Sequence, residues 1–226
     1  MTKKIEQSNA DNFNTFLRER ARERGINFVN FSLNGQDRDA AADYLFAVES
    51  RYALVEFKSH ETDLGSEGDK PKRIRLCELL EDAQHARWKK YHDSCHFIAW
   101  LNGVTTDLDF NIYRMEVCNQ RICKLNQKIT ALGPERSNRV SGTKFHDEFF
   151  GGRRSLSLPD FELYLAWLMT KSSDSEDSTL QLTTVNLQRK VFGSETFNSV
   201  REANDWIVAQ KNGAPPAPKS TRRLKP

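Results

Sequence analysis

The sequence predicts an α/β fold for its first half, and two observations carry this prediction. Segments with apolar residues at helical spacing alternate with short runs rich in β-branched and aromatic residues. The run from His96 to Leu101 is continuously apolar after its first residue, as is typical of a strand covered on both faces. The expected elements are a helix over residues 11–24, strands over 26–33, 42–48 and 52–59, a helix over 73–91 and a strand over 96–101.

Local signals support these elements in turn. Asp11 can cap the first helix, and Gly25 can end it. The polar residues 34–37 separate the first two strands, and the short connection that follows the second strand predicts a tight hairpin. Residues 61–72 contain glycine, proline and charged residues without apolar periodicity, which predicts a mobile loop.

The rest of the sequence predicts an α+β extension over residues 104–211. Whether this extension packs on the core formed by residues 1–103 is left open. Residues 212–226 contain four prolines and several basic residues, and we expect them to be disordered. The expected parts of the extension are a strand over 110–118, a helix over 157–171, a serine-rich acidic linker over 172–179 and a helix over 199–211 with a capping box of Ser199 and Glu202.

The composition favours a soluble globular protein, and a cytoplasmic location is the default expectation. Hydrophobic residues make up 38% of the 226 residues and charged residues 29%. The sequence contains no run of about 18 apolar residues, so no membrane span is expected. Its first residues lack the apolar stretch of a secretory signal. The formal net charge of +3 does not by itself indicate a nucleic-acid partner.

The four cysteines, Cys77, Cys95, Cys118 and Cys123, form no dense pattern. In a cytosolic protein of this size, we expect reduced thiols rather than disulfides. Three histidines lie near Cys95, but no paired Cys-x-x-Cys accompanies them. Zinc binding is therefore only a weak alternative.

The third expected strand carries an unusual pair of charged residues. Because side chains alternate between the faces of a strand, Leu54, Glu56 and Lys58 share one face. The other face is wholly apolar and suits a core. Burying unpaired charge is costly, so two charged residues on such an apolar strand indicate a site. The simpler alternative is a surface hairpin in which Lys58 forms a salt bridge with Glu56 or Asp43.

The expected hairpin brings a second carboxylate to this face. If Glu49 and Ser50 form a two-residue turn, the register places Asp43 opposite Glu56. Directly opposed Cβ atoms lie about 4.5–5.5 Å apart. Carboxylates that close repel each other unless a cation lies between them, and hard divalent ions favour oxygen ligands. Glu-Ser is not a favoured pair for such a turn, and a longer connection with a bulge would leave the carboxylates close but not opposite.

Asp43 followed by Glu56-Phe57-Lys58 resembles the PD-(D/E)xK signature of the restriction-endonuclease-like nuclease superfamily. The resemblance covers about the first 103 residues, although Ala42 stands where the name has proline. It implies an αβββαβ core with a mixed central sheet flanked by helices. It also implies that Asp43, Glu56 and the carbonyl of Phe57 hold Mg²⁺, with Mn²⁺ as a substitute. Lys58 would orient the attacking water.

Some members of the superfamily add further residues. A Gln and a Tyr on the following helix correspond best to Gln84 and Tyr91, which share a helix face but stand further apart than in the common motif. Many members also place an acid on the first helix. Glu19 and Glu23 are both candidates, and neither is preferred.

Basic residues gather around the expected second helix and could contact phosphates. Such contacts give sequence-independent affinity that falls with salt. The best placed for substrate binding are Lys72 and Arg73, the alternative being an ordinary solvated helix face.

The expected function is therefore Mg²⁺-dependent hydrolysis of phosphodiester bonds in nucleic acid, with DNA favoured over RNA by the resemblance. The alternative is an inactive module that keeps the nuclease fold and binds nucleic acid or a protein. Cutting both strands of a duplex needs a homodimer, a larger complex or two successive nicks, and the sequence does not choose among these.

Overall fold

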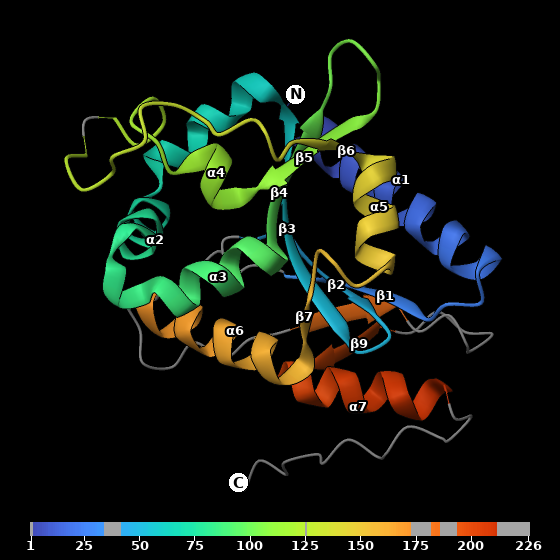
Figure 1. Cartoon of the computed structure of the whole chain (residues 1–226). Helices are drawn as coiled ribbons and strands as arrows, with labels where there is room; N and C mark the ends of the chain where they lie inside the picture. The colour runs from blue at the N-terminus through green and yellow to red at the C-terminus, as the bar shows by residue number, and fades with distance from the viewer. Residues whose placement is uncertain (1, 34–41, 125, 173–181, 186–193, 212–226) are drawn as a thin grey trace, which may run out of the picture.

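A computed structural model gives the architecture drawn in Figure 1, and it describes residues 2–33, 42–124, 126–172, 182–185 and 194–211. Two short 3-10 helices, η2 and η3, accompany the α-helices and strands. In order, the elements are α1 (Thr2–Glu23), β1 (Phe28–Ser32), β2 (Tyr44–Val48), β3 (Arg51–His60), η2 (Glu61–Asp69), α2 (Pro71–Glu81), η3 (Ala83–His85), α3 (Ala86–Cys95), β4 (His96–Leu101), β5 (Leu108–Ile112), α4 (Tyr113–Val117), β6 (Val140–Ser141), α5 (Gly142–Phe150), β7 (Leu156–Ser157), α6 (Leu158–Ser172), β8 (Leu182–Val185), β9 (Ser194–Phe197) and α7 (Val200–Lys211).

One mixed sheet joins all the strands of the described residues. Its order is β6-β5-β4-β3-β2-β1-β8-β9, and β7 pairs with β3 beside this path. The pairing of β3 with β4 is parallel, and the other pairings are antiparallel. The α/β fold with a mixed sheet flanked by helices is thus confirmed. Strands that follow residue 103 extend the same sheet at both ends.

Helices cover both faces of this sheet (Figure 1). Helices α1 and α5 pack on the face that carries Ala53, Val55 and Phe57. Helices α2, α3 and α6 pack on the opposite face, which carries Leu54. The alternation expected along β3 is therefore confirmed. Because the second face is covered as well, the charged residues that follow Leu54 on it are enclosed rather than exposed.

The β2–β3 hairpin has the expected two-residue turn and register. Val48 pairs with Arg51 and Tyr44 pairs with Val55, so Glu49 and Ser50 form the turn. Glu49 takes a positive φ of 52°, as the first position of a two-residue hairpin loop can require. Its main-chain N–H donates to the carbonyl of Asn27, and its carboxylate accepts from the N–H of the same residue. These two bonds explain how a residue that is unfavourable for such a turn is accommodated.

Two helix boundaries differ from the sequence prediction. Helix α1 begins at Thr2 rather than at Asp11, which lies inside the helix and accepts a hydrogen bond from Gln7. The single helix expected over residues 73–91 is wrong, because Asp82 has an extended backbone between α2 and η3. Its side chain accepts the N–H of Gln84, and this local bond competes with helix continuation.

Two other expectations are also wrong. Residues 61–72 are not a loop: they form η2, which has Leu64 and Glu67 buried, and the first turn of α2. The strand expected over 110–118 ends at Ile112, where α4 begins. The side chain of Asn111 accepts the N–H of Ile112 and so caps the end of β5. In contrast, β4 has the expected bounds, and α6 and α7 agree with theirs within one residue at each end.

The expectation of reduced cysteines is wrong for two of the four. Cys77 of α2 and Cys118, the residue after α4, form a disulfide across 41 residues of sequence. Their Cα atoms lie 5.1 Å apart, within the range that a disulfide spans. The contact depends on the packing of α4 against α2, which residue spacing does not reveal. Cys95 and Cys123 are free and buried.

Some sequence predictions concern residues outside the described ranges. These are the turn over 34–37, the linker over 172–179 beyond Ser172, and the tail over 212–226. Among the helices that the structure describes, none combines the length and apolar character needed to cross a membrane.

Candidate active site

Glu56 and Lys58 lie side by side near the end of β3 and are almost completely buried. They are 3% and 4% exposed, and the Lys58 ammonium donates to the Glu56 carboxylate at 2.6 Å. This pair resembles the salt bridge of the simpler alternative, but it lies inside the protein rather than on a surface hairpin. A buried charge must be compensated by its neighbours, so the surroundings of the pair decide what it can do.

Asp43 joins this pair from the neighbouring strand. It lies one residue beyond the last β2–β3 pair, and its N–H donates to the carbonyl of Val55. Its carboxylate accepts a 2.7 Å hydrogen bond from the N–H of Phe57, the residue between Glu56 and Lys58. Burial and the nearby Glu56 carboxylate raise the pKa of Asp43 to about 8, against the lowering effect of the Phe57 N–H. The carboxylates of Asp43 and Glu56 are thus neighbours at the open end of the hairpin, away from its turn.

Glu67 of η2 brings a third carboxylate that the sequence did not reveal. It is fully buried and lies 2.9 Å from the Lys58 ammonium. The hydroxyl of Tyr113, the first residue of α4, donates to it at 2.6 Å. Burial alone would raise the pKa of Glu67, but Lys58, Lys70 and Arg73 hold it well below its usual range. Glu67 is therefore a carboxylate anion enclosed by cations.

Two further basic residues come from the start of α2. Lys70 lies 2.5 Å from Glu67 and 3.3 Å from Glu56, and its side chain is 42% exposed. Arg73 is buried, with its Nε 3.4 Å from Glu67 and its terminal nitrogen 3.8 Å from Glu56. Both residues thus bridge the two glutamates. We refer to Asp43, Glu56, Lys58, Glu67, Lys70 and Arg73 as the charged cluster.

The first helix contributes an acid, but not one of those expected. Helix α1 crosses the end of β3, where the side-chain amide of Asn9 donates to the carbonyls of Lys58 and Ser59. Glu6 lies one turn earlier, and its pKa is raised by burial and, more weakly, by the Glu56 carboxylate, against the lowering effect of Lys58. Glu23, by contrast, pairs with Arg20 on the surface near the far end of the helix.

Three other candidate residues have different surroundings. Gln84 is exposed in η3, and no described hydrogen bond or ion pair joins its side chain to the charged cluster. The Tyr91 hydroxyl donates to Asp160 of α6 and accepts from Arg87, so it links α3 to α6. Lys72 is partly buried in the first turn of α2. Of the two expected substrate-binding basic residues, Arg73 is thus the one enclosed by the cluster.

The histidines considered for zinc serve a different arrangement. The hydroxyl of Tyr164 lies 2.7 Å from Nδ1 of His92 and 2.8 Å from Nδ1 of His96. Nε2 of His92 accepts the N–H of Arg114, and both imidazoles are fully buried. Burial, with the nearby His96 and Arg114, holds the pKa of His92 well below its usual value. These contacts join α3, β4 and α6 behind the charged cluster.

The chemistry of the cluster is a balance of carboxylates and cations. Lys58 is held as an ammonium, because the carboxylates of Glu56 and Glu67 raise its pKa above the usual range despite burial. It can donate hydrogen bonds but is not available as a proton acceptor. Within the described residues, no group of three or more His, Cys, Asp or Glu side chains is arranged to hold a metal ion. Any metal bound here would need ligands beyond the protein's carboxylates.

The sequence contains weak signals for the start of two helices that carry site residues, α1 and α2. The sequence from Thr2 to Arg24 lacks glycine and proline, which would have allowed α1 to start early enough to include Glu6. Pro71 is a favoured first residue of a helix and could have placed the start of α2. For Glu67 and Tyr113, we find no local signal.

No protein-family model, curated protein or solved structure matches this chain.

Proposed function

We propose that the chain is a metal-dependent nuclease that hydrolyses phosphodiester bonds in nucleic acid, with DNA as the first substrate to test. The observation that carries the proposal is the meeting of Asp43, Glu56 and Lys58 at the end of the β2–β3 hairpin. The order α1, β1–β3, α2/α3 and β4 agrees with the αβββαβ core that the PD-(D/E)xK resemblance implies. This agreement supports a nuclease-like core over about the first 103 residues.

Asp43 and Glu56 have the donor chemistry to hold Mg²⁺ or Mn²⁺. Mg²⁺ usually keeps several waters and takes only one or two protein carboxylates, with substrate phosphates completing its shell. Two carboxylates and the Phe57 carbonyl are therefore a sufficient protein contribution. The pKa of Asp43 is raised first by burial and then by the Glu56 carboxylate, so a cation beside Asp43 would be favourable. When bound, the metal would lower the pKa of a water and stabilise charge on the phosphate.

Lys58 would act as a donor. Because its ammonium is held charged by Glu56 and Glu67, it would orient the attacking water or stabilise the phosphate oxygens rather than remove a proton. Substrate would approach from the side on which the cluster reaches solvent. That side includes Lys70, whose partly exposed ammonium could also contact a phosphate.

One observation favours a second function, a non-catalytic module that binds nucleic acid or a protein. The carboxylate of Glu56 already contacts Lys58, Lys70 and, at longer range, Arg73. A carboxylate compensated in this way needs no metal. In this alternative the cluster stabilises the fold, and the variants described next would lose stability but no activity.

Cleavage assays with supercoiled, linear and single-stranded DNA and with RNA, in Mg²⁺ or Mn²⁺, separate the two functions. We expect Glu56→Gln and Lys58→Ala to lower cleavage at least about a hundredfold, since each removes a group that acts on the reacting phosphate. Glu116→Gln is the matched control: Glu116 is also a buried carboxylate paired with an arginine, Arg139, but it lies outside the charged cluster.

The outcomes are distinct. Cleavage that is lost in both cluster variants and kept in Glu116→Gln would support the nuclease. Cleavage that persists in folded Glu56→Gln protein would contradict the proposed site. If the wild-type protein binds neither metal by calorimetry and cleaves none of the substrates, the binding module becomes the better account.

A further inference from the structure

Glu67 has more charged partners than are needed to compensate the charge of one buried carboxylate. It contacts three cations, Lys58, Lys70 and Arg73, and accepts the hydroxyl of Tyr113. It lies outside the hairpin that carries Asp43, Glu56 and Lys58, and it is fully buried. The contacts from Lys58, Lys70 and Tyr113, at 2.9, 2.5 and 2.6 Å, are short charge-assisted hydrogen bonds that fix the orientation of both partners. Arg73 lies further away, at 3.4 Å.

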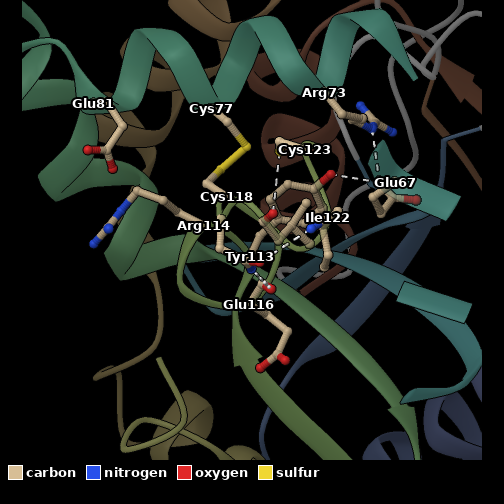
Figure 2. The surroundings of a disulfide bond; sticks show 12 residues. Glu67, Arg73, Cys77, Glu81, Tyr113, Arg114, Glu116, Cys118, Ile122 and Cys123 are labelled. Atoms are coloured by element: carbon tan, nitrogen blue, oxygen red, sulfur yellow. Dashed lines mark hydrogen bonds and ion pairs between the residues drawn. A yellow bond between two sulfur atoms is a disulfide. The ribbon is translucent and has the colours of Figure 1, made fainter. Parts of the chain in front are cut away.

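The elements around Glu67 hold its carboxylate in place. Figure 2 shows Arg73 reaching it from α2 and Tyr113 reaching it from α4, with the Cys77–Cys118 disulfide joining these two segments. Next to Glu67 in the chain, Gly68 lies tightly against the main chain of Ile122. Glu67 therefore cannot move far from Lys58 unless these contacts change.

We propose that Glu67 is a positioning residue that shares the Lys58 ammonium with Glu56 and so fixes where that ammonium lies. This inference rests on the proposed nuclease function. The ammonium is shared between two carboxylates, at 2.6 Å from Glu56 and 2.9 Å from Glu67. Without Glu67, its strongest remaining partner is Glu56. Lys58 would then pair with Glu56 alone, which would strengthen its hold on the carboxylate that the metal needs, and it would leave the position from which it can orient water.

A purely structural role for Glu67 predicts something different. Removing one member of a buried ion-pair network usually destabilises the fold, whatever the network does. Stability alone therefore cannot test the proposal. A role that acts through Lys58 has a specific signature: the effect of changing Glu67 should disappear when Lys58 is absent, because coupled residues give non-additive effects.

The test is a double-mutant cycle of Glu67→Gln and Lys58→Ala, with Mn²⁺ and Mg²⁺ affinity measured by calorimetry on the full chain. We expect Glu67→Gln to weaken metal binding about tenfold in the wild-type background, and less than about threefold when Lys58 is already alanine. In cleavage assays, kcat of Glu67→Gln should fall at least about tenfold with KM nearly unchanged. Glu116→Gln should change neither quantity, although it also removes a buried charge.

A milder variant keeps the test decisive if Glu67→Gln does not fold. Tyr113→Phe removes one hydrogen bond to Glu67 and leaves the carboxylate in place. We expect it to weaken metal binding about threefold, and again only when Lys58 is present. Equal effects in the two backgrounds would overturn the positioning role while leaving the nuclease function standing. If the wild-type protein neither binds metal nor cleaves, both the proposed function and this inference fail.

Discussion

The carboxylate of Asp43 accepts a 2.7 Å hydrogen bond from the N–H of Phe57, the residue between Glu56 and Lys58. This bond ties the start of β2 to the end of β3 and fixes Asp43 beside the two charged residues of the motif. It does not offset the burial of Asp43 and the proximity of Glu56, which together raise the pKa of Asp43 to about 8. The site therefore favours either a proton or a metal cation next to Asp43.

The first prediction concerns stability and pH in the absence of metal. An unfolded chain releases the Asp43 proton near the usual pKa of 3.8, while the folded chain keeps it until about pH 8. The folded state binds more protons in this interval, so the Asp43 contribution to the free energy of unfolding decreases as pH rises from about 4 to 8. Asp43→Asn stays neutral and can still accept from Phe57.

We therefore expect Asp43→Asn to become more stable relative to the wild-type protein as pH rises. The difference in free energy of unfolding between the variant and the wild-type protein should increase by about 1–2 kcal/mol from pH 4 to pH 9. The full pKa shift of Asp43 would correspond to about 1.4 kcal/mol per pKa unit. We expect a smaller change in stability, because Asp43 is partly exposed. Urea unfolding at a series of pH values measures the difference. Asp160→Asn should show the opposite sign, and mainly below about pH 4, since hydrogen bonds from Tyr91 and Ser157 lower the pKa of Asp160 from its usual value of 3.8. A pH-independent difference for Asp43→Asn would contradict the raised pKa.

The hairpin part of the site was predictable because it depends on local rules. Alternation along β3 and the two-residue turn were enough to bring Asp43 next to Glu56 and Lys58. The rest of the charged cluster depends on long-range packing. Glu67 reaches Lys58 because η2 folds back onto β3, and η2 also packs against α4, where Tyr113 lies 46 residues further along the chain. No pattern of spacing encodes such contacts, and the glycine, proline and charged residues of 61–72 predict a mobile loop instead.

The second prediction concerns the acid on the first helix. Glu6→Gln should weaken Mg²⁺ or Mn²⁺ binding about tenfold, because it removes a negative charge that interacts electrostatically with Lys58 and Glu56 beside the expected metal ligands. Glu23→Gln is the matched control on the same helix, since Glu23 pairs with Arg20 at the surface. Calorimetry on both variants decides the point. Equal affinities for the two would remove Glu6 from the site.

The third prediction concerns the disulfide between Cys77 and Cys118. Reducing this disulfide removes a cross-link between residues 41 positions apart and so raises the conformational entropy of the unfolded chain. For a loop of this size, the free energy of unfolding should fall by about 4 kcal/mol. Urea unfolding of the wild-type protein with and without a dithiol reductant measures this loss. The Cys77→Ala/Cys118→Ala double variant is the control, and its stability should not respond to the reductant. An equal response of both proteins would show that the reductant acts elsewhere.

The last prediction tests whether η2 positions the charged cluster. A Cβ built at Gly68 would lie 1.9 Å from the carbonyl oxygen of Ile122. Because that oxygen belongs to the main chain and cannot rotate away as a side chain could, η2 must shift to accommodate the Cβ. Gly65, in the same element, has nothing within 4 Å of such a Cβ. We expect Gly68→Ala to cost about 1–3 kcal/mol of stability, as overpacking does, and to move Glu67 away from Lys58.

Thermal unfolding of Gly68→Ala and Gly65→Ala gives the stability difference, and metal affinity reports on the cluster. Because the displaced carboxylate would release the Lys58 ammonium toward Glu56, Gly68→Ala should weaken metal binding in the same direction as Glu67→Gln. Gly65→Ala should retain the wild-type affinity. If Gly68→Ala is destabilised but binds metal normally, then η2 supports the fold without controlling Lys58. In that case the position of Lys58 depends on its pairing with Glu56 alone.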